Sequence, residues 1–152
     1  MSKKNYISLA RKSAEIQINE LKKVKKVFNK SFSKAVDLIL KCKGKVIFAG
    51  IGKSGLVARK ISATFSSVGV PSFFCDPAQA LHGDMGQIEK KDILIIFSYS
   101  GNTSELTNML KYANRYRIKI IGVASKPESI LLKASDIKLV LPKVKESDLT
   151  GM

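Results

Sequence analysis

The chain has 152 residues, of which 45% are hydrophobic, and its formal net charge is +15. A chain of this length and composition forms one domain with a substantial core, which excludes disordered, low-complexity and repeat proteins. No apolar run reaches the length of a signal-peptide core or a membrane span, so we expect a cytoplasmic protein that does not enter membranes.

The positive charge is concentrated in the first third of the chain. Residues 1–45 contain 13 Lys and Arg against 3 Asp and Glu. A basic arm can bind nucleic acid, but this one has few aromatic residues and no helix-turn-helix pattern, so we expect no nucleic-acid binding. The positive charge of the chain should still favour anionic ligands. Cys42 and Cys75 lie on different predicted elements without zinc-like neighbours, which indicates reduced thiols and no metal site.

Apolar residues recur at three- and four-residue steps over the first 41 positions, the spacing of one helix face. They run from Ile7 to Phe28 and from Phe32 to Leu40, with a break near Asn29 and an end at Gly44. This pattern predicts an N-terminal helical arm over residues 1–44. Its apolar stripe must either cover the sheet of the same domain or join a second subunit.

From Lys45 onward, short apolar runs alternate with helical patterns. The predicted strands are residues 46–49, 72–75, 93–97, 118–123 and 137–141. The predicted helices between them are residues 55–68, 103–116 and 127–134. The alternation predicts an α/β domain over residues 45–152, a three-layer α/β/α sandwich with a five-stranded, mainly parallel sheet. Ligands in such folds bind at the carboxyl ends of strands near the switch point, so the loops after the first and third strands should be neighbours.

The third predicted strand ends in a polar loop with the sequence SYSGNTSE. This loop contains hydroxyl, amide and carboxylate side chains and one glycine, at Ser98, Ser100, Gly101, Asn102, Thr103 and Glu105. Hydroxyls and free backbone N–H groups at the start of a helix form a donor-rich pocket that suits a phosphate monoester. Helix capping is an alternative, because Asn102 and Glu105 have the spacing of a capping box.

A second glycine-rich loop follows the first predicted strand. Residues 50–55 satisfy G-x-G-x-x-G, and Asp76 ends the second strand, so a dinucleotide-binding Rossmann site is an alternative. Lys53 and Ser54 inside the fingerprint weaken that alternative, because a large cation would crowd the pyrophosphate turn. A P-loop is excluded, because Ile47 occupies the position of the first Walker glycine.

Three motifs occur in order along residues 45–146: GKSG at 52–55, PAQALHGDMG at 77–86, and the polar loop at 98–105. Together they resemble the D-arabinose-5-phosphate isomerase family of SIS (sugar isomerase) domains. The resemblance implies a flavodoxin-like or Rossmann-like fold, a dimer or tetramer, and no cofactor. It also implies conversion of D-ribulose 5-phosphate to D-arabinose 5-phosphate through a cis-enediol, a step that supplies the Kdo sugar of lipopolysaccharide.

By position in these motifs, the resemblance implies four catalytic residues, Lys53, His82, Glu105 and Glu146. The sugar phosphate would contact a further set, namely Gly52, Ser54, Ser98, Ser100, Gly101, Asn102 and Thr103. Glu146 is our first candidate for the proton-transfer base, with His82 assisting, Lys53 stabilising an oxyanion and Glu105 orienting hydroxyls. The alternatives are a hydrogen-bonded structural role for His82, a surface cation for Lys53 and a tail charge for Glu146.

The sequence departs from this family's pattern near its end. It stops at Met152, before the family's hydroxyl-rich segment, its closing helix with another active-site histidine, and its CBS modules. Lys145–Leu149 also replaces a more apolar stretch. We therefore expect the 152-residue chain to bind a phosphosugar but to isomerise it weakly or not at all, and a non-catalytic phosphosugar-binding module remains an alternative.

Overall fold

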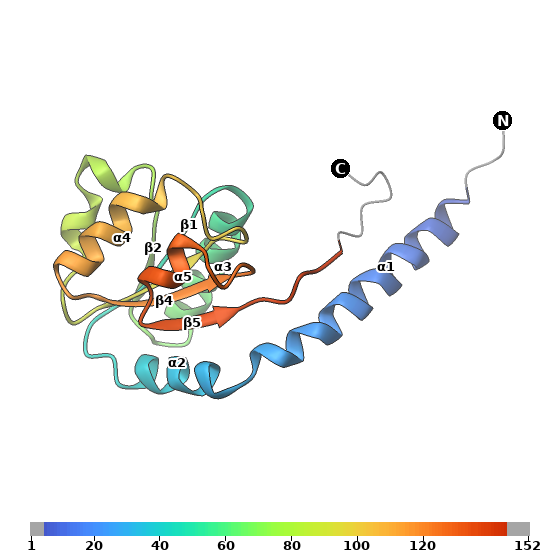
Figure 1. The fold of residues 1–152 in the computed structure, drawn as a ribbon, viewed down its shortest axis with the longest axis horizontal. Helices are drawn as coiled ribbons and strands as arrows, with labels where there is room; N and C mark the ends of the chain where they lie inside the picture. Colours follow the sequence, from blue (N-terminus) through green and yellow to red (C-terminus); the bar gives the residue numbers. More distant parts are fainter. Residues whose placement is uncertain (1–4, 146–152) are drawn as a thin grey trace.

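A five-stranded parallel sheet forms the centre of the molecule in the computed structural model, which describes residues 5–145 (Figure 1). The sheet order is β2-β1-β3-β4-β5. The strands are β1 (Val46–Gly50), β2 (Ser72–Cys75), β3 (Ile93–Phe97), β4 (Lys119–Ala124) and β5 (Ile137–Val140). The predicted sheet is confirmed, and its strand ends differ from prediction by at most one residue, within the usual uncertainty of such boundaries.

Helices cover both faces of the sheet and complete the predicted three layers. One face packs against α2 (Lys30–Leu40) and α3 (Gly52–Ser67), and the other against α4 (Leu106–Arg115) and α5 (Ile130–Ala134). Alternate residues of each strand point to opposite faces, so Phe48 packs on the α3 side while Ile47 packs on the α4 side. Both faces are therefore apolar, as a doubly covered parallel sheet requires.

The order of the strands places the two polar loops side by side. β1 pairs with β2 on one edge and with β3 on the other, in parallel, and Gly50 lies opposite Phe97. Both strands end at the same edge of the sheet, where their connections diverge to opposite faces. The predicted neighbourhood of the loops after β1 and β3 is confirmed, and it lies at the topological switch point.

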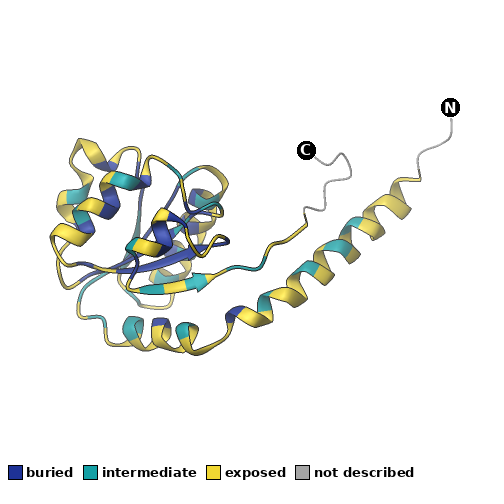
Figure 2. Cartoon of the chain, in the orientation of Figure 1, coloured by how far each residue is buried: buried dark blue, intermediate teal, exposed yellow. Residues whose placement is uncertain are grey.

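The described part of the N-terminal arm contains two α-helices, joined by the short 3-10 helix Val24–Val27, and the two α-helices pack differently. Asn29 caps α2 by accepting a hydrogen bond from the Ser31 N–H at 2.8 Å, which explains the predicted break at that position. α2 packs on the sheet, whereas α1 (Tyr6–Lys23) extends away from the domain and contains no buried residue (Figures 1 and 2). No helix within residues 5–145 combines the length and apolarity needed to cross a membrane.

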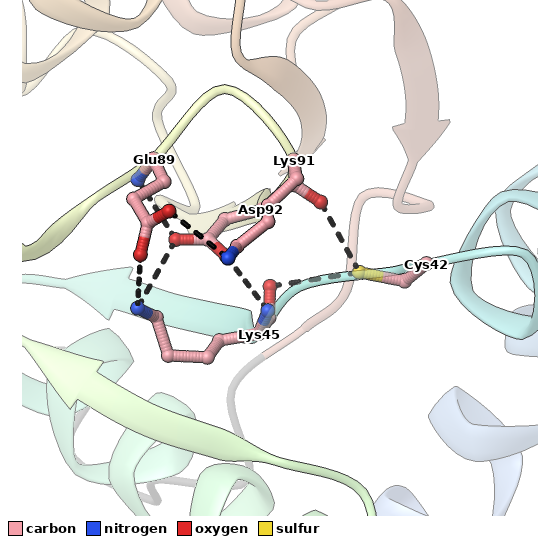
Figure 3. A network of polar contacts seen from close by, with 5 residues as sticks. All are labelled: Cys42, Lys45, Glu89, Lys91 and Asp92. Atoms are coloured by element: carbon pink, nitrogen blue, oxygen red, sulfur yellow. Dashed lines mark hydrogen bonds and ion pairs between the residues drawn. The ribbon is translucent and has the colours of Figure 1, made fainter.

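A polar cluster joins the chain before β1 to the turn before β3 (Figure 3). Asp92 is buried, with 1% of its surface exposed, and accepts hydrogen bonds from the backbone N–H groups of Lys45 at 2.7 Å and Glu89 at 2.8 Å. The Lys45 ammonium lies 3.6 Å from the same carboxylate. The Cys42 thiol donates weakly to the carbonyls of Lys45 and Lys91, both at 3.7 Å. This cluster stabilises the amino ends of β1 and β3, at the opposite end of these strands from the polar loops.

Candidate functional site

A hollow of about 230 Å³ lies at the carboxyl ends of the central strands. Its walls come from the start of α3, from the end of β3 with its loop, and from the ends of β4 and β5. The lining residues are Lys53, Ser54, Val57, Phe97, Ser98, Tyr99, Val123 and Leu141. The fold thus brings Lys53 and Ser54 to the same hollow as Ser98, although some 45 residues separate them in sequence.

Hydroxyl groups hold the loop after β3 in a closed turn. The buried Ser98 Oγ accepts from the Gly101 N–H at 3.0 Å and shares a 2.9 Å hydrogen bond with Thr103 Oγ1. Ser100 Oγ accepts from the Asn102 N–H at 3.3 Å. These hydroxyls therefore shape the loop, in addition to any contact with a ligand.

Backbone donors of this loop remain free. Within residues 5–145, the N–H groups of Ser100, Thr103 and Ser104 have no hydrogen-bond acceptor. α4 begins at Leu106 and not at Thr103 as predicted, because the N–H groups of Leu106 and Thr107 close a turn on the Thr103 and Ser104 carbonyls. Unpaired donors clustered before a helix favour binding of an anion, because a bound anion satisfies them.

The capping-box alternative for this loop is wrong. Glu105 is the N-cap residue of α4 and makes no capping bond with its side chain. The Asn102 side-chain oxygen accepts from the Ile130 N–H at 3.0 Å, and the Gly101 carbonyl accepts from the Leu131 N–H at 3.0 Å. The loop is therefore held against the first turn of α5, by bonds between residues far apart in sequence.

Sequence reasoning missed Tyr99, which lines the hollow. Its carbonyl accepts from both the backbone N–H of Ser125, at 2.9 Å, and the Ser125 hydroxyl, at 2.7 Å. These bonds tie the loop to the end of β4. The available signal was a large aromatic residue within an otherwise polar loop, but its partners could not be identified without the fold.

The Tyr99 hydroxyl also holds the segment that follows β5. It accepts from the Val144 N–H at 3.3 Å, and the next N–H, of Lys145, donates to the Glu20 carboxylate of α1 at 3.1 Å. Glu146 follows directly and lies outside the described residues. The chain that leads to Glu146 therefore passes beside the hollow.

Glu105 is exposed at the start of α4. A hydrogen bond from its own backbone N–H, assisted by the Ser104 hydroxyl at 2.8 Å, lowers the pKa of Glu105 below its usual value. The side chain is therefore ionised at neutral pH. An ionised carboxylate suits the predicted role of accepting hydrogen bonds from sugar hydroxyls, whereas a general base works best with a pKa near the working pH.

The other two predicted catalytic residues within residues 5–145 lie in different surroundings. Lys53 is exposed in the first turn of α3 and lines the hollow without any ion pair in the described part of the chain. His82 is exposed in the short helical turn Ala80–His82 and does not line this hollow. Its side chain makes no hydrogen bond within residues 5–145, so the structural alternative for His82 has no support.

The glycine fingerprint after β1 has a packing reason. A Cβ at Gly55 would lie 2.6 Å from the Gly50 carbonyl oxygen, so the close approach of α3 to β1 requires glycine at position 55. The pattern does not need a dinucleotide to explain it. Within residues 5–145, no group of three or more His, Cys, Asp or Glu side chains could hold a metal ion.

Comparisons with known proteins agree with this geometry. The family model described as the SIS domain matches residues 39–152. A Listeria monocytogenes crystal structure superposes with a TM-score of 0.93 at 32% identity, covering 100% of this chain and 80% of that one. An Escherichia coli CFT073 protein in complex with arabinose 5-phosphate gives a TM-score of 0.87 at 35% identity, covering 100% and 81%.

A curated relative extends the comparison to a longer protein. The arabinose 5-phosphate isomerase of Escherichia coli K12 is 40% identical over 124 residues, which are 82% of this chain. The match spans 38% of that enzyme's length, so this chain corresponds to less than half of it.

Proposed function

Because the chain belongs to the SIS domain family, we propose that it is a cytoplasmic sugar-phosphate aldose-ketose isomerase that interconverts D-ribulose 5-phosphate and D-arabinose 5-phosphate. The observation that carries this proposal is the loop after β3, whose unpaired N–H groups adjoin the hollow lined by Lys53. The complex of the Escherichia coli relative with arabinose 5-phosphate supports a phosphosugar ligand. The product would supply the Kdo sugar of lipopolysaccharide.

The phosphate would bind at the loop after β3. The N–H groups of Ser100, Thr103 and Ser104 would donate to its oxygens, and the start of α4 adds the positive end of a helix dipole. The remaining contacts in this proposal come from Gly52, Ser54, Ser98, Gly101 and Asn102. A phosphate bound there would leave the sugar carbons facing Lys53.

The chemistry requires only proton transfer. A base removes a proton from the carbon next to the carbonyl, a cis-enediol forms, and the proton returns to the neighbouring carbon, so neither carbon needs an external oxidant. Lys53 would stabilise the enediol oxygen, Glu105 would orient hydroxyls, and His82 would assist ring opening. Glu146 is the proposed base. The hydrogen bond from the Val144 N–H to Tyr99, which lines the hollow, supports this assignment, because it brings the chain two residues before Glu146 to the site.

Removing the two bonded hydroxyls of the loop is expected to weaken phosphosugar binding. In Ser98→Ala/Thr103→Ala, the Gly101 N–H loses its side-chain acceptor and the loop loses the 2.9 Å bond that closes it. We expect at least about a tenfold loss of affinity for arabinose 5-phosphate, the equivalent of one or two hydrogen bonds. Thermal shift and calorimetric titration measure this.

The control for this variant is Ser67→Ala, which removes one exposed hydroxyl at the far end of α3. It should bind like the unmodified chain. An unchanged thermal shift in Ser98→Ala/Thr103→Ala would remove the phosphate-site assignment. Stabilisation of the unmodified chain by NAD, and not by a sugar phosphate, would favour the dinucleotide alternative instead.

Turnover, which we expect to be weak in the 152-residue chain, should disappear in Glu146→Gln while binding persists. An amide has nearly the same shape as a carboxylate but cannot accept the proton from the sugar carbon. Conversion of ribulose 5-phosphate is measured beside the thermal shift on the same samples. Isomerisation that survives in Glu146→Gln would show that another residue is the base. Binding without turnover even in a chain extended to the length of the curated relatives would favour a non-catalytic phosphosugar-binding module.

We also propose that the chain forms a homo-oligomer through α1. This helix has no buried residue, and its apolar side chains include Ile18, 55% exposed, and Leu21, 69% exposed. An unpartnered apolar stripe of this kind favours association. A hollow of about 250 Å³ beside α2, lined only by apolar side chains, adds further uncovered apolar surface.

Charges on this stripe are expected to lower the oligomeric mass. In Ile18→Glu/Leu21→Glu, a carboxylate replaces each apolar side chain. Burying a carboxylate in a subunit interface is costly unless a cation pairs with it, so the interface should not form. Light scattering coupled to size-exclusion chromatography should give a monomer. Lys12→Glu/Asn19→Glu, on the opposite face of the helix, should keep the mass of the unmodified chain. A monomeric unmodified chain would contradict the proposal.

A further inference from the structure

A second hollow, of about 210 Å³, lies at the amino ends of the central strands. Five of its nine lining residues are lysines: Lys41, Lys43, Lys90, Lys91 and Lys119. The others are Leu38, Cys42, Asp92 and Ile93. We refer to it as the lysine hollow. β3 runs from it to the loop of the proposed phosphosugar site, a separation of roughly 16 Å at the usual rise of a strand.

Ion pairs neutralise only part of this positive charge. Lys91 pairs with Glu89 at 3.1 Å, and Lys119 pairs with Asp136 at 2.6 Å. Within residues 5–145, the other three lysines of the hollow make no ion pair: Lys41, Lys43 and Lys90. Three lysines without a counter-charge from the described chain therefore line one hollow.

Asp92 does not supply that counter-charge. Its carboxylate is buried, and its two oxygens already accept from the N–H groups of Lys45 and Glu89 and face the Lys45 ammonium (Figure 3). Lys41 and Lys43 follow the carboxyl end of α2, where the helix dipole favours cations. Lys90 comes from the turn before β3, where no helix dipole favours a cation. The position of Lys90 at the hollow is therefore not explained by its local structure.

We propose that the lysine hollow binds a compact ligand that carries several phosphate charges, such as the triphosphate group of a nucleotide. Ammonium groups on flexible stems are point charges that accommodate phosphate oxygens without a fixed geometry. The lysines surround a single hollow from three segments, which suits a compact anion. A nucleic-acid backbone spreads its charges along an extended track and would need a longer basic stripe.

Cys42 provides a measurement of occupancy, because this half-buried cysteine lines the lysine hollow. The other cysteine does not interfere: burial raises the pKa of the Cys75 thiol to about 11, so it stays protonated and shielded. The test follows the reaction of the 152-residue chain with N-ethylmaleimide, at constant ionic strength, as inorganic tripolyphosphate is added. An uncharged reagent is needed, because an anionic one would itself compete for the lysines.

We expect saturable protection of Cys42, with about a tenfold slower reaction when the hollow is occupied. The reaction should be absent in Cys42→Ala, which identifies the labelled thiol. Tripolyphosphate bound at the phosphosugar loop would not shield Cys42, because that loop lies at the opposite end of the strands. Protection that rises without saturation, or no protection, would overturn the proposal.

Matched lysine variants separate a site from general attraction of anions. Lys41→Gln/Lys43→Gln/Lys90→Gln should lose the protection. Lys12→Gln/Lys60→Gln/Lys111→Gln removes the same charge from exposed lysines outside the hollow and should keep it. An equal loss of Cys42 protection in the two triple variants would overturn the proposal. Protection by a single-stranded RNA at lower concentration than tripolyphosphate would overturn it in favour of a nucleic-acid surface.

Discussion

Replacing Gly101 by alanine is expected to weaken the binding of arabinose 5-phosphate by about 100-fold, through roughly 1–2 kcal/mol of backbone strain and a similar cost of overpacking. The backbone φ of Gly101 is +68°, a conformation that residues with a Cβ adopt at a cost. A Cβ at this position would also overlap the side chain of Ser129. The loop after β3 must then move away from α5, and its free N–H groups would move with it. Calorimetric titration measures the change.

Two further variants distinguish this explanation from a general effect of losing a glycine. Gly86→Ala is the matched control, because a Cβ there meets no atom within 4 Å and its φ is not positive, so affinity should not change. Gly101→Ala/Ser129→Gly removes the overlap but not the strained φ, and should recover part of the affinity. Unchanged affinity in Gly101→Ala would contradict the proposed role of this loop.

Asp92→Ala is expected to lower the free energy of unfolding by about 3–5 kcal/mol, because two partly buried backbone donors and the Lys45 ammonium lose their buried, charged acceptor. The carboxylate accepts from the N–H groups of Lys45 and Glu89, and its burial gives water little access to these donors (Figure 3). Denaturant unfolding measures the change. The affinity of the folded fraction for a phosphosugar should stay the same, because Asp92 lies at the opposite end of β3 from the loop.

Asp92→Asn keeps one acceptor oxygen but turns an N–H group toward a backbone donor, so its stability should lie between those of Asp92→Ala and the unmodified chain. Asp37→Ala removes an exposed carboxylate of α2 that forms no ion pair within residues 5–145, and should change stability by less than about 0.5 kcal/mol. Similar stabilities of Asp92→Ala and Asp37→Ala would show that the cluster contributes little to the fold.

The layers of this domain could be predicted from local patterns in the sequence. Strands and helices follow from the periodicity of apolar residues within one segment, and this periodicity indicated the five strands and the break near Asn29. The alternation of strands and helices indicated that the sheet is parallel. The meeting of the loops after β1 and β3 followed from a general rule of parallel sheets. Lys53 and Ser98 could therefore be assigned to one site before the structure was known.

The contacts that hold this site could not be predicted in the same way. Asn102 bonds to Ile130, and Tyr99 bonds to Ser125 and to Val144, pairs that lie 26 to 45 residues apart. The capping box failed for this reason: the spacing of Asn102 described a possible local partner, and a distant N–H offered a better one. Local patterns reflect contacts within a turn or an element, whereas these bonds depend on the path of the whole chain. The same limit applies to the arm, whose periodicity predicted an apolar stripe but could not show that α2 covers the sheet while α1 extends from it.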